Sequence, residues 1–304
     1  FVLSGTPGGA NTAPEGANAV QQPELSQPSG FYDSAFQLTM TVPEGTTVYY
    51  TTDGSDPTAE SEQYTGPITV DDMTNTENRL SARTDIAASG ADAPNGFVDK
   101  AAVIRAVAVD AEGRVSEPVT RTYFVGTTNS GYYKTMKVVS LVTDPDNLFD
   151  YETGIYVTGK IFDEENQGSS NPWGGWGGWG GFGMKNPWEM EANYTQKGRE
   201  WEREASFTLF ENGQEILSQN VGIRIKGAAS RSVPQKSFNV YARRDYGMPE
   251  LSYDFFDGTA TKAKNGKVID VFESIVLRNG GNDTNYAFFR DSINQNLVAD
   301  RDME

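Results

Sequence analysis

A cluster of positive charge lies in residues 221–244, which read VGIRIKGAASRSVPQKSFNVYARR. This stretch contains no Asp or Glu, although the whole chain carries 42 acidic residues against 25 basic ones. Cationic side chains gathered without acidic partners are suited to neutralising the oxygens of a phosphate group. The basic residues of the stretch are Arg224, Lys226, Arg231, Lys236, Arg243 and Arg244.

The spacing of these residues predicts a hairpin that can cover a phosphate. Arg224 and Lys226 lie two apart, so both belong to one face of a strand, opposite Ile223 and Ile225. A turn of small residues follows, and Lys236 opens the next strand, where we expect its ammonium to face a cleft. Backbone N–H groups and hydroxyls of such a turn can cap phosphate oxygens while the Lys neutralises charge. The alternative is a basic sheet edge that resists aggregation; the missing acidic partners favour phosphate binding.

Composition restricts the remaining chemistry. The chain has no Cys and no His, which excludes disulfides, thiolate metal sites, Ser-His and Cys-His triads, and ordinary zinc or haem sites. Catalysis must therefore use carboxylates, Lys, Arg, hydroxyls or a metal bound by oxygen. A net charge of −17 argues against nucleic acid or an anionic membrane as a partner. No apolar run is long enough to span a bilayer.

An acidic turn offers a second candidate site. Residues 144–152 read DPDNLFDYE, and Asp144, Asp146 and Asp150 could hold a calcium ion through carboxylate oxygens. The spacing is not that of an EF-hand loop. The alternative is a solvated turn.

A Gly-Trp segment, residues 171–188, offers a third. Its Gly-Gly-Trp repeat cannot form a packed helix or strand alone, so we expect it to be the least ordered part of its domain. Trp173, Trp176 and Trp179 could stack on the sugar rings of a polysaccharide or pack on a protein partner. The alternative is a loop whose Trp residues fold back on their own domain.

The elements that must position these residues are mostly strands. Residues 1–29 are rich in Pro, Gly and Ala and predict a linker. Residues 30–126 show short alternating strands with frequent turns, which is typical of an antiparallel β-sandwich. Residues 71–100 have the composition of an insertion in one of its loops.

Residues 132–304 predict a second domain of α+β type. Strand-like stretches occupy 133–143 and 154–162, an Asn-Gly turn joins two strands within 204–227, and 236–247 continues the sheet. Residues 272–283 predict a buried strand that ends in a Gly-Asn-Asp loop. Residues 284–302 have helical periodicity.

Two motifs in the first part of the chain resemble known families. The segment 30–126, with YYTTDGSDPT as its most distinctive piece, resembles the small domain at the C-terminus of chitobiases and β-hexosaminidases. In that family the domain is an accessory module without catalytic residues, which implies a spacer or adhesion role here. TPGGAN at 6–11 resembles the closing motif of lamin-tail-like domains.

Four blocks of the second domain resemble the spore coat protein H (CotH) family of atypical secreted kinases. They are GIRIKGAASRSVPQKSFNVYAR, YG, FESIVLRNGGND and FRDSINQNLV, in family order. Lys226 stands where the motif has Arg, Ala228 and Ala229 replace Asn-Ser, and Gln235 replaces a Lys. The residues that match the family motifs are Arg224, Ser230, Arg231, Pro234, Lys236, Ser237, Arg278, Asn279, Asn282, Asp283, Arg290 and Asp291.

The CotH resemblance implies a kinase that transfers the γ-phosphoryl group of ATP, with Mg²⁺, to Ser of a secreted or surface protein. It implies that Lys226, Ser230, Arg231 and Lys236 contact the ATP phosphates. The family's catalytic and metal-binding Asp residues are expected beyond Glu304, so 132–304 corresponds to the N-terminal lobe. The composition is that of an exported bacterial protein at the cell surface or beyond it. The alternatives are a catalytically inactive adhesion protein and a carbohydrate-binding surface module.

Overall fold

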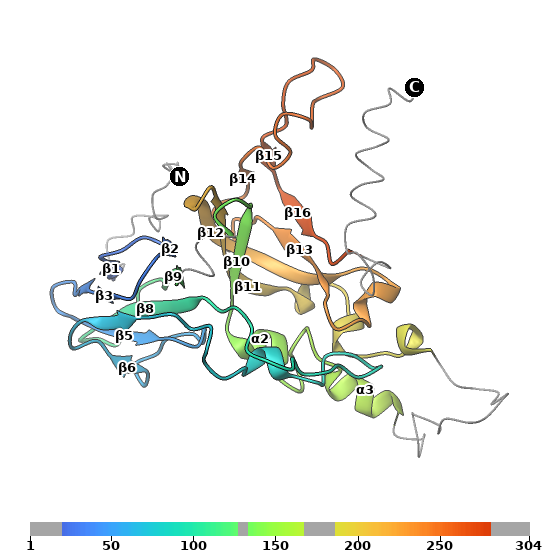
Figure 1. The fold of residues 1–304 in the computed structure, drawn as a ribbon, viewed down its shortest axis with the longest axis horizontal. Coiled ribbons are helices and arrows are strands. Elements are labelled where there is room, and N and C mark those ends of the chain that lie inside the picture. The colour runs from blue at the N-terminus through green and yellow to red at the C-terminus, as the bar shows by residue number, and fades with distance from the viewer. Residues whose placement is uncertain (1–19, 127–132, 167–185, 281–304) are drawn as a thin grey trace.

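Strands dominate the protein, and the α-helices among the residues described are short. The computed structural model describes residues 20–126, 133–166 and 186–280 (Figure 1). Its helices α2 (Pro145–Phe149) and α3 (Gly159–Asn166) belong to the second of two strand-rich bodies. None of the helices in these ranges has the length and apolar content needed to cross a bilayer.

The first body is a small sandwich. Its larger sheet contains, in spatial order, β2 (Gly30–Tyr32), β9 (Val119–Val125), β8 (Ala102–Asp110), β5 (Thr46–Thr51) and β6 (Glu62–Gln63). Two short pairs accompany it: β1 (Glu24–Leu25) with β4 (Met40–Thr41), and β3 (Phe36–Leu38) with β7 (Ile68–Val70). Leu38, Val48 and Tyr123 are fully buried in the core that they share. The predicted sandwich is present, except that β2 pairs with β9 in parallel rather than antiparallel fashion.

Two boundaries of this body can be compared with the sequence prediction. Glu24 and Leu25 form a strand with β4 and Ser29 is buried, so the sandwich begins within the segment predicted as a linker. Residues 1–19, which include the lamin-tail-like motif, lie outside the described residues. The predicted insertion lies between β7 and β8 and contains only a short 3-10 turn, η1 (Leu80–Ala82).

The second body is built on a five-stranded antiparallel sheet. Its spatial order is β10 (Val138–Val142), β11 (Arg203–Glu211), β12 (Gln214–Lys226), β13 (Ser237–Tyr241) and β16 (Ser274–Leu277). Asn212 and Gly213 both have positive φ and close the β11–β12 hairpin, as the Asn-Gly turn predicts. The predicted continuity of 216–242 with 272–278 is confirmed by the β12–β13 and β13–β16 pairings. Phe207, Leu209 and Val221 lie in the core on one face.

Two elements of the second body differ from the sequence prediction. Ile155 and Val157 are buried, but they lie outside any strand, and α3 begins at Gly159. Gly159 has φ +63, a left-handed value that redirects the chain into the helix. β16 is not buried, because its residues alternate between exposed and half-buried at the edge of the sheet. A small pair, β14 (Leu251–Ser252) with β15 (Val271–Phe272), extends away from the sheet, and residues 284–302 lie outside the described residues.

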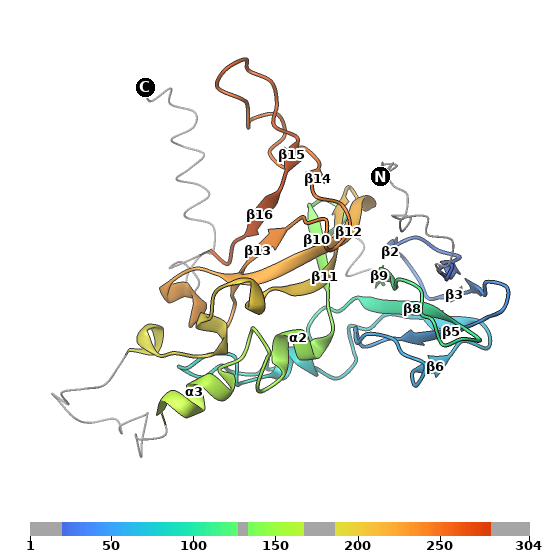
Figure 2. The same ribbon diagram turned by 180° about the vertical axis from the view of Figure 1, so that it is seen from behind.

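The two bodies are in direct contact. Phe210 of β11 is fully buried and contacts Phe31 and Phe124 of the sandwich, with ring centroids 5.8 and 5.5 Å away. Thr122 and Ser140 share a hydrogen bond of 2.8 Å between the two sheets. In Figures 1 and 2 the inserted segment 71–100 leaves the sandwich and runs alongside α2 toward α3. We call this segment the strap.

Candidate functional site

The basic stretch forms the end of β12, a tight turn and the start of β13. Ile223 and Ile225 are buried while Lys226 is exposed, as the alternation predicts. Gly227 has φ +124, and a Cβ at this position would collide with Ser230 Oγ. Only Gly fits this turn, because an added methyl group would meet both a strained backbone and an occupied space.

Lys236 lies inside the protein, with 4% of its surface exposed. Its ammonium donates to three backbone carbonyls, those of Ile86 at 2.7 Å, Arg231 at 2.6 Å and Val233 at 2.8 Å. An ammonium has three N–H donors, so these bonds use all of them. The prediction that Lys236 faces a cleft is therefore wrong for the conformation described.

Two aromatic rings complete the surroundings of this ammonium. Nζ lies 3.9 Å from the ring centroid of Tyr194 and 5.2 Å from that of Tyr156. The Tyr156 hydroxyl accepts from the Lys236 N–H at 3.0 Å and donates to the Pro234 carbonyl at 2.9 Å. Carbonyls and ring faces favour the charged form, and desolvation opposes it. Burial lowers the pKa of Lys236 from 10.5 to about 7.

Arg231 is buried beside the same turn. Its Nε donates to the Gly227 carbonyl at 2.7 Å, and its Nη1 donates to the carbonyls of Thr195 at 3.0 Å and Gln196 at 2.8 Å. The guanidinium therefore links the turn to the segment before β11. In this conformation its role is to fix the turn, rather than to face solvent.

Residues of two separate motif blocks meet next to Lys236. Ser237 Oγ donates to Asn279 Oδ1 at 2.9 Å and accepts from the Asn279 N–H at 3.0 Å. Asn279 Nδ2 donates to the Gln235 carbonyl at 2.6 Å. Both side chains are buried. The end of β16 is thereby attached to the start of β13, which places the two blocks at one end of the sheet.

The accessible groups of the turn are few. Lys226 is exposed and has no ion pair among the described residues, and Ser230 is half-buried. Pro234 and Gln235 are exposed on the other side of η5 (Ala229–Arg231). Of the four residues predicted to contact ATP phosphates, Lys226 and Ser230 are reachable from solvent, whereas Arg231 and Lys236 are enclosed.

Two further cations of the stretch, Arg224 and Arg243, lie beside an acid that the sequence does not single out. Glu202 has a fully buried carboxylate, which accepts from Arg243 Nε at 2.8 Å and from the Tyr246 hydroxyl at 3.1 Å. Arg224 Nε lies 3.4 Å from the same carboxylate. The guanidinium groups of Arg224 and Arg243 flank the Tyr241 ring, 4.4 and 4.7 Å from its centroid. Glu202 lies just before β11, Arg224 lies on β12 and Arg243 follows β13, so nothing in the local sequence around Glu202 marks it.

An open groove of about 500 Å³ lies beside this charged group. Its lining residues are Arg199, Tyr241, Ala242, Arg243, Arg244, Asp245, Pro249, Glu273 and Ser274. Arg199 is paired with Asp245. Lys236 does not line this groove.

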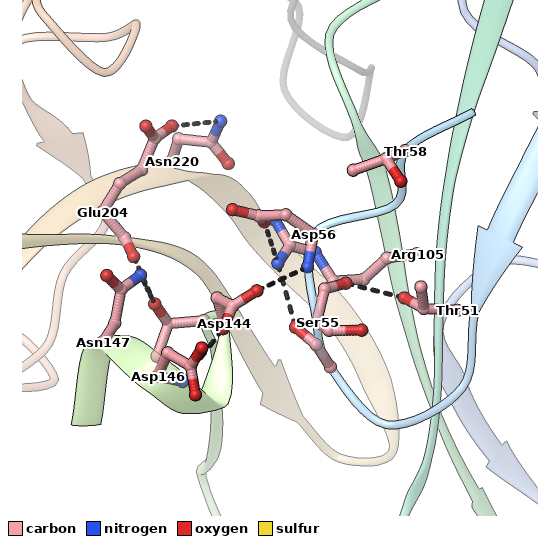
Figure 3. A network of polar contacts seen from close by, with 12 residues as sticks. Thr51, Ser55, Asp56, Thr58, Arg105, Asp144, Asp146, Asn147, Glu204 and Asn220 are labelled. Atoms are coloured by element: carbon pink, nitrogen blue, oxygen red, sulfur yellow. Dashed lines mark hydrogen bonds and ion pairs between the residues drawn. The ribbon is translucent and has the colours of Figure 1, made fainter. Parts of the chain in front are cut away.

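Two of the three Asp residues proposed for calcium, Asp144 and Asp150, accept hydrogen bonds from nearby backbone and hydroxyl groups. Asp144 caps α2 by accepting from the Asp146 N–H at 2.9 Å, and its second oxygen accepts from the Asp56 N–H of the sandwich at 2.8 Å (Figure 3). Asp150 accepts from the N–H and the hydroxyl of Thr153, and these bonds hold the pKa of Asp150 below its ordinary value. Within the described ranges, no three acidic side chains are placed to share a metal ion.

Asp144 and its neighbours instead join the two bodies. Asp56 is ion-paired with Arg105, whose Nη1 donates to the Gly54 carbonyl at 2.9 Å. Gly54 and Asp56 belong to the YYTTDGSDPT turn, so the most distinctive motif of the sandwich docks onto the start of α2 (Figure 3).

One of the remaining sequence candidates is described by the structure. Arg278 is exposed at the end of β16. The other sequence candidates lie outside the described residues: Trp173, Trp176, Trp179, Asn282, Asp283, Arg290 and Asp291.

Comparisons with known proteins bear on the first body. Residues 36–123 match the family model described as Fn3 associated. No curated protein and no solved structure matches the chain, and no match to the CotH family was found. The match falls on the region that resembles the chitobiase C-terminal domain, but it names a different family. Residues 36–123 are thus similar to the Fn3-associated family, a β-sandwich-type module of extracellular proteins.

Proposed function

We propose that the chain is part of an exported, multidomain kinase of the CotH type. An Fn3-associated module precedes a lobe that binds ATP with Mg²⁺ and presents its γ-phosphoryl group to a Ser of a secreted or surface protein. Such chemistry depends mainly on positioning and on neutralising phosphate charge.

One observation carries this proposal. Ser237 and Asn279 come from motif blocks about forty residues apart in sequence, yet they share two hydrogen bonds at one end of the sheet. Lys226, Ser230, Arg231 and Lys236 lie in the same turn region. The pairing of β13 with β16 brings the two blocks together, and a shared site requires such convergence.

The residues divide into two roles. Lys226 and Ser230 are reachable and supply a cation and a hydroxyl to phosphate oxygens. Arg231 fixes the turn through backbone carbonyls. Lys236 is the phosphate lysine of the proposal, and it exchanges carbonyl oxygens for phosphate oxygens when nucleotide binds.

A second candidate is a catalytically inactive surface or adhesion protein, or a carbohydrate-binding module. The observation that favours it is the complete use of the Lys236 donors by carbonyls, together with pairing of Arg243 with Glu202. In that case the motif residues serve only to fix the fold.

Titration of the full-length protein with Mg²⁺-ATP separates the two. Wild type is expected to bind, and Lys236→Met and Lys226→Ala to bind more weakly by roughly tenfold or more, because each loses a charge-assisted contact. Arg244→Ala, which removes an exposed cation at the groove, is the matched control and should retain wild-type affinity. If wild type shows no binding, or binds as Lys236→Met does, the kinase assignment fails. Sedimentation with insoluble polysaccharide then tests the carbohydrate alternative.

A further inference from the structure

The strap is held closed at its base. Lys100 Nζ donates to the carbonyls of Thr76 at 2.9 Å and Val98 at 3.1 Å, and Asn78 Nδ2 donates to the Gly96 carbonyl at 2.7 Å. These bonds join the two arms of the strap near the sandwich. The strap therefore has a defined position that does not depend on the second body alone.

The tip of the strap, residues 83–90, docks on the second body. The Asp85 carbonyl accepts from the Thr158 N–H at 2.9 Å and from its hydroxyl at 3.1 Å. The Ala88 N–H donates to the Tyr194 hydroxyl at 3.1 Å. Ala87 and Ala88 are each only 4% exposed. The tip thus covers the surface around Tyr194, whose ring lies against the Lys236 ammonium.

Ile86 lies at the centre of this contact. Its carbonyl oxygen is 2.7 Å from Lys236 Nζ and accepts one of the three ammonium protons. The other two acceptors, the carbonyls of Arg231 and Val233, belong to the turn that carries the lysine. One of the three acceptors therefore comes from the sandwich module. The Ile86 oxygen occupies a position at hydrogen-bond distance from Nζ that a phosphate oxygen could take in its place.

We propose that the tip of the strap is an intramolecular cap, which holds Lys236 away from nucleotide and must withdraw before an ATP phosphate can bind there. This inference rests on the kinase function proposed above. It adds that the Fn3-associated module regulates the neighbouring lobe.

The composition of the contact suits a cap that can be released. The buried side chains of the tip are small, Ala87 and Ala88, and the rest of the contact consists of a few hydrogen bonds and the ring contact between Arg83 and Phe149. Segments with few buried apolar contacts open locally at low free-energy cost. Because Lys100 and Asn78 hold the base, the tip can leave while β7 stays paired with β3 and β8 with β5 and β9.

The test compares three variants of the full-length protein with wild type. In the cap variant, residues 83–90 are replaced by a Gly-Ser segment of equal length. In the matched control, the exposed residues 92–95 of the same strap are replaced in the same way. Tyr194→Phe is a milder change, because it keeps the ring over Lys236 and removes only the oxygen that holds Ala88.

Two readouts are measured. The first is the rate at which an amine-reactive reagent labels Lys236, located by mass spectrometry, with the exposed Lys226 as internal reference. The second is the dissociation constant for Mg²⁺-ATP. A cap that is closed in about nine molecules of ten weakens apparent affinity about tenfold. We expect faster labelling and about tenfold tighter binding in the cap variant, a smaller change of the same direction in Tyr194→Phe, and wild-type values in the control.

The outcomes distinguish this inference from the function on which it rests. If the cap variant labels and binds ATP as wild type does, the cap is wrong while the kinase assignment stands. If Lys236 is labelled faster in the cap variant but neither wild type nor any variant binds ATP, the kinase assignment is wrong, and the proposed regulation of nucleotide binding is wrong as well. If the cap variant does not fold, unchanged labelling and affinity in Tyr194→Phe overturn the cap.

Discussion

Lys236 shows how a protein can solvate a cation with its own backbone. Three carbonyl oxygens replace the water that the ammonium would have in solution, and Tyr194 presents its ring face at 3.9 Å. No carboxylate takes part in these contacts. The charge is therefore stabilised by dipoles and the ring faces of Tyr194 and Tyr156, and desolvation is strong enough to lower the pKa of Lys236 to about 7.

This lowered pKa predicts a pH dependence of stability. The unfolded chain keeps the proton on Lys236 up to about pH 10.5, whereas the folded chain releases it near 7. Between these values the unfolded state binds more protons, so raising the pH stabilises the fold, by at most about 1.4 kcal/mol per pH unit. Denaturant unfolding of wild type and Lys236→Met from pH 7 to 9.5 checks this. The difference between the two should grow with pH, and the exposed Lys226→Met should track wild type; parallel curves would refute the linkage.

Glu202 is the second residue with a strong expected effect on stability. Its buried carboxylate forms ion pairs with Arg224 and Arg243 and accepts a hydrogen bond from the Tyr246 hydroxyl. Glu202→Gln removes the charge while preserving size, and it leaves two guanidinium groups without a counter-charge. We expect a loss of about 1–3 kcal/mol in the free energy of unfolding, discounted because both Arg side chains are partly exposed. The exposed Glu200→Gln is the control and should change stability by less than about 0.5 kcal/mol. Equal losses of unfolding free energy in the two variants would mean that the Glu202 interactions do not contribute to stability.

At the scale of the element, the turn between β12 and β13 is a rigid unit. Gly227 supplies a backbone conformation closed to other residues, Arg231 fastens the turn to the chain before β11, and Ser237 fastens it to β16. The three attachments point in different directions. The turn therefore keeps its shape even where its surface is exposed.

Substituting Gly227 tests this rigidity. Gly227→Ala meets a left-handed φ and a collision with Ser230 Oγ, so it should destabilise the protein by about 1–3 kcal/mol. Gly258→Ala is the control, since Gly258 also has a positive φ of +79 but open space around the added methyl group. Thermal unfolding should show the larger loss for Gly227→Ala. If the two substitutions cost the same, the Ser230 contact contributes nothing.

The elements that the sequence predicts well are those with strong local signals. The Asn212-Gly213 hairpin and the alternation of Ile223 and Ile225 with Lys226 are read directly, because turn chemistry and period-two burial act on neighbouring residues. The stretch 154–162 was misassigned because buried Ile155 and Val157 resemble a strand, while the left-handed Gly159 decides the path.

The candidate site was less accessible to prediction. Lys236 shares its strand parity with Phe238 and with the fully buried Val240, and that parity signals an inward side chain. Its partners could not be found, because Ile86 is 150 residues away and contributes only a backbone oxygen, which no side-chain pattern reveals. The same holds for Glu202, whose partners Arg224 and Arg243 are distant in sequence.

At the scale of the whole molecule, the described parts of the two bodies meet through a cluster of aromatic rings and several polar contacts. Phe31 and Phe124 stack with centroids 4.5 Å apart, and the buried Phe210 of the second body meets both edge-on. Asp144 bonds Asp56 across the same junction. Because these contacts sit on the two central sheets, the bodies should unfold together.

Phe210→Ala tests this coupling. It removes a fully buried ring from the junction and should lower the free energy of unfolding by about 3–5 kcal/mol. Calorimetry should show one transition for wild type and two for the variant, as each body unfolds by itself. Phe256→Ala, at a ring that is half exposed, should leave a single transition. A single transition in Phe210→Ala would mean that contacts other than Phe210 couple the unfolding of the two bodies.

The strap has a consequence for how this module can be inherited. Sandwich modules are readily exchanged between genes when they touch their neighbours only through a linker. Here a transplanted module would carry a 71–100 loop with nothing to bind, and the lobe left behind would expose Phe210 and lose the Ile86 carbonyl from Lys236. Recombination at the module boundary is thus unfavourable for both the transplanted module and the lobe that remains. The length of the insertion between β7 and β8 should therefore vary together with the identity of the following domain, and a sandwich that precedes a different partner should have a short turn there.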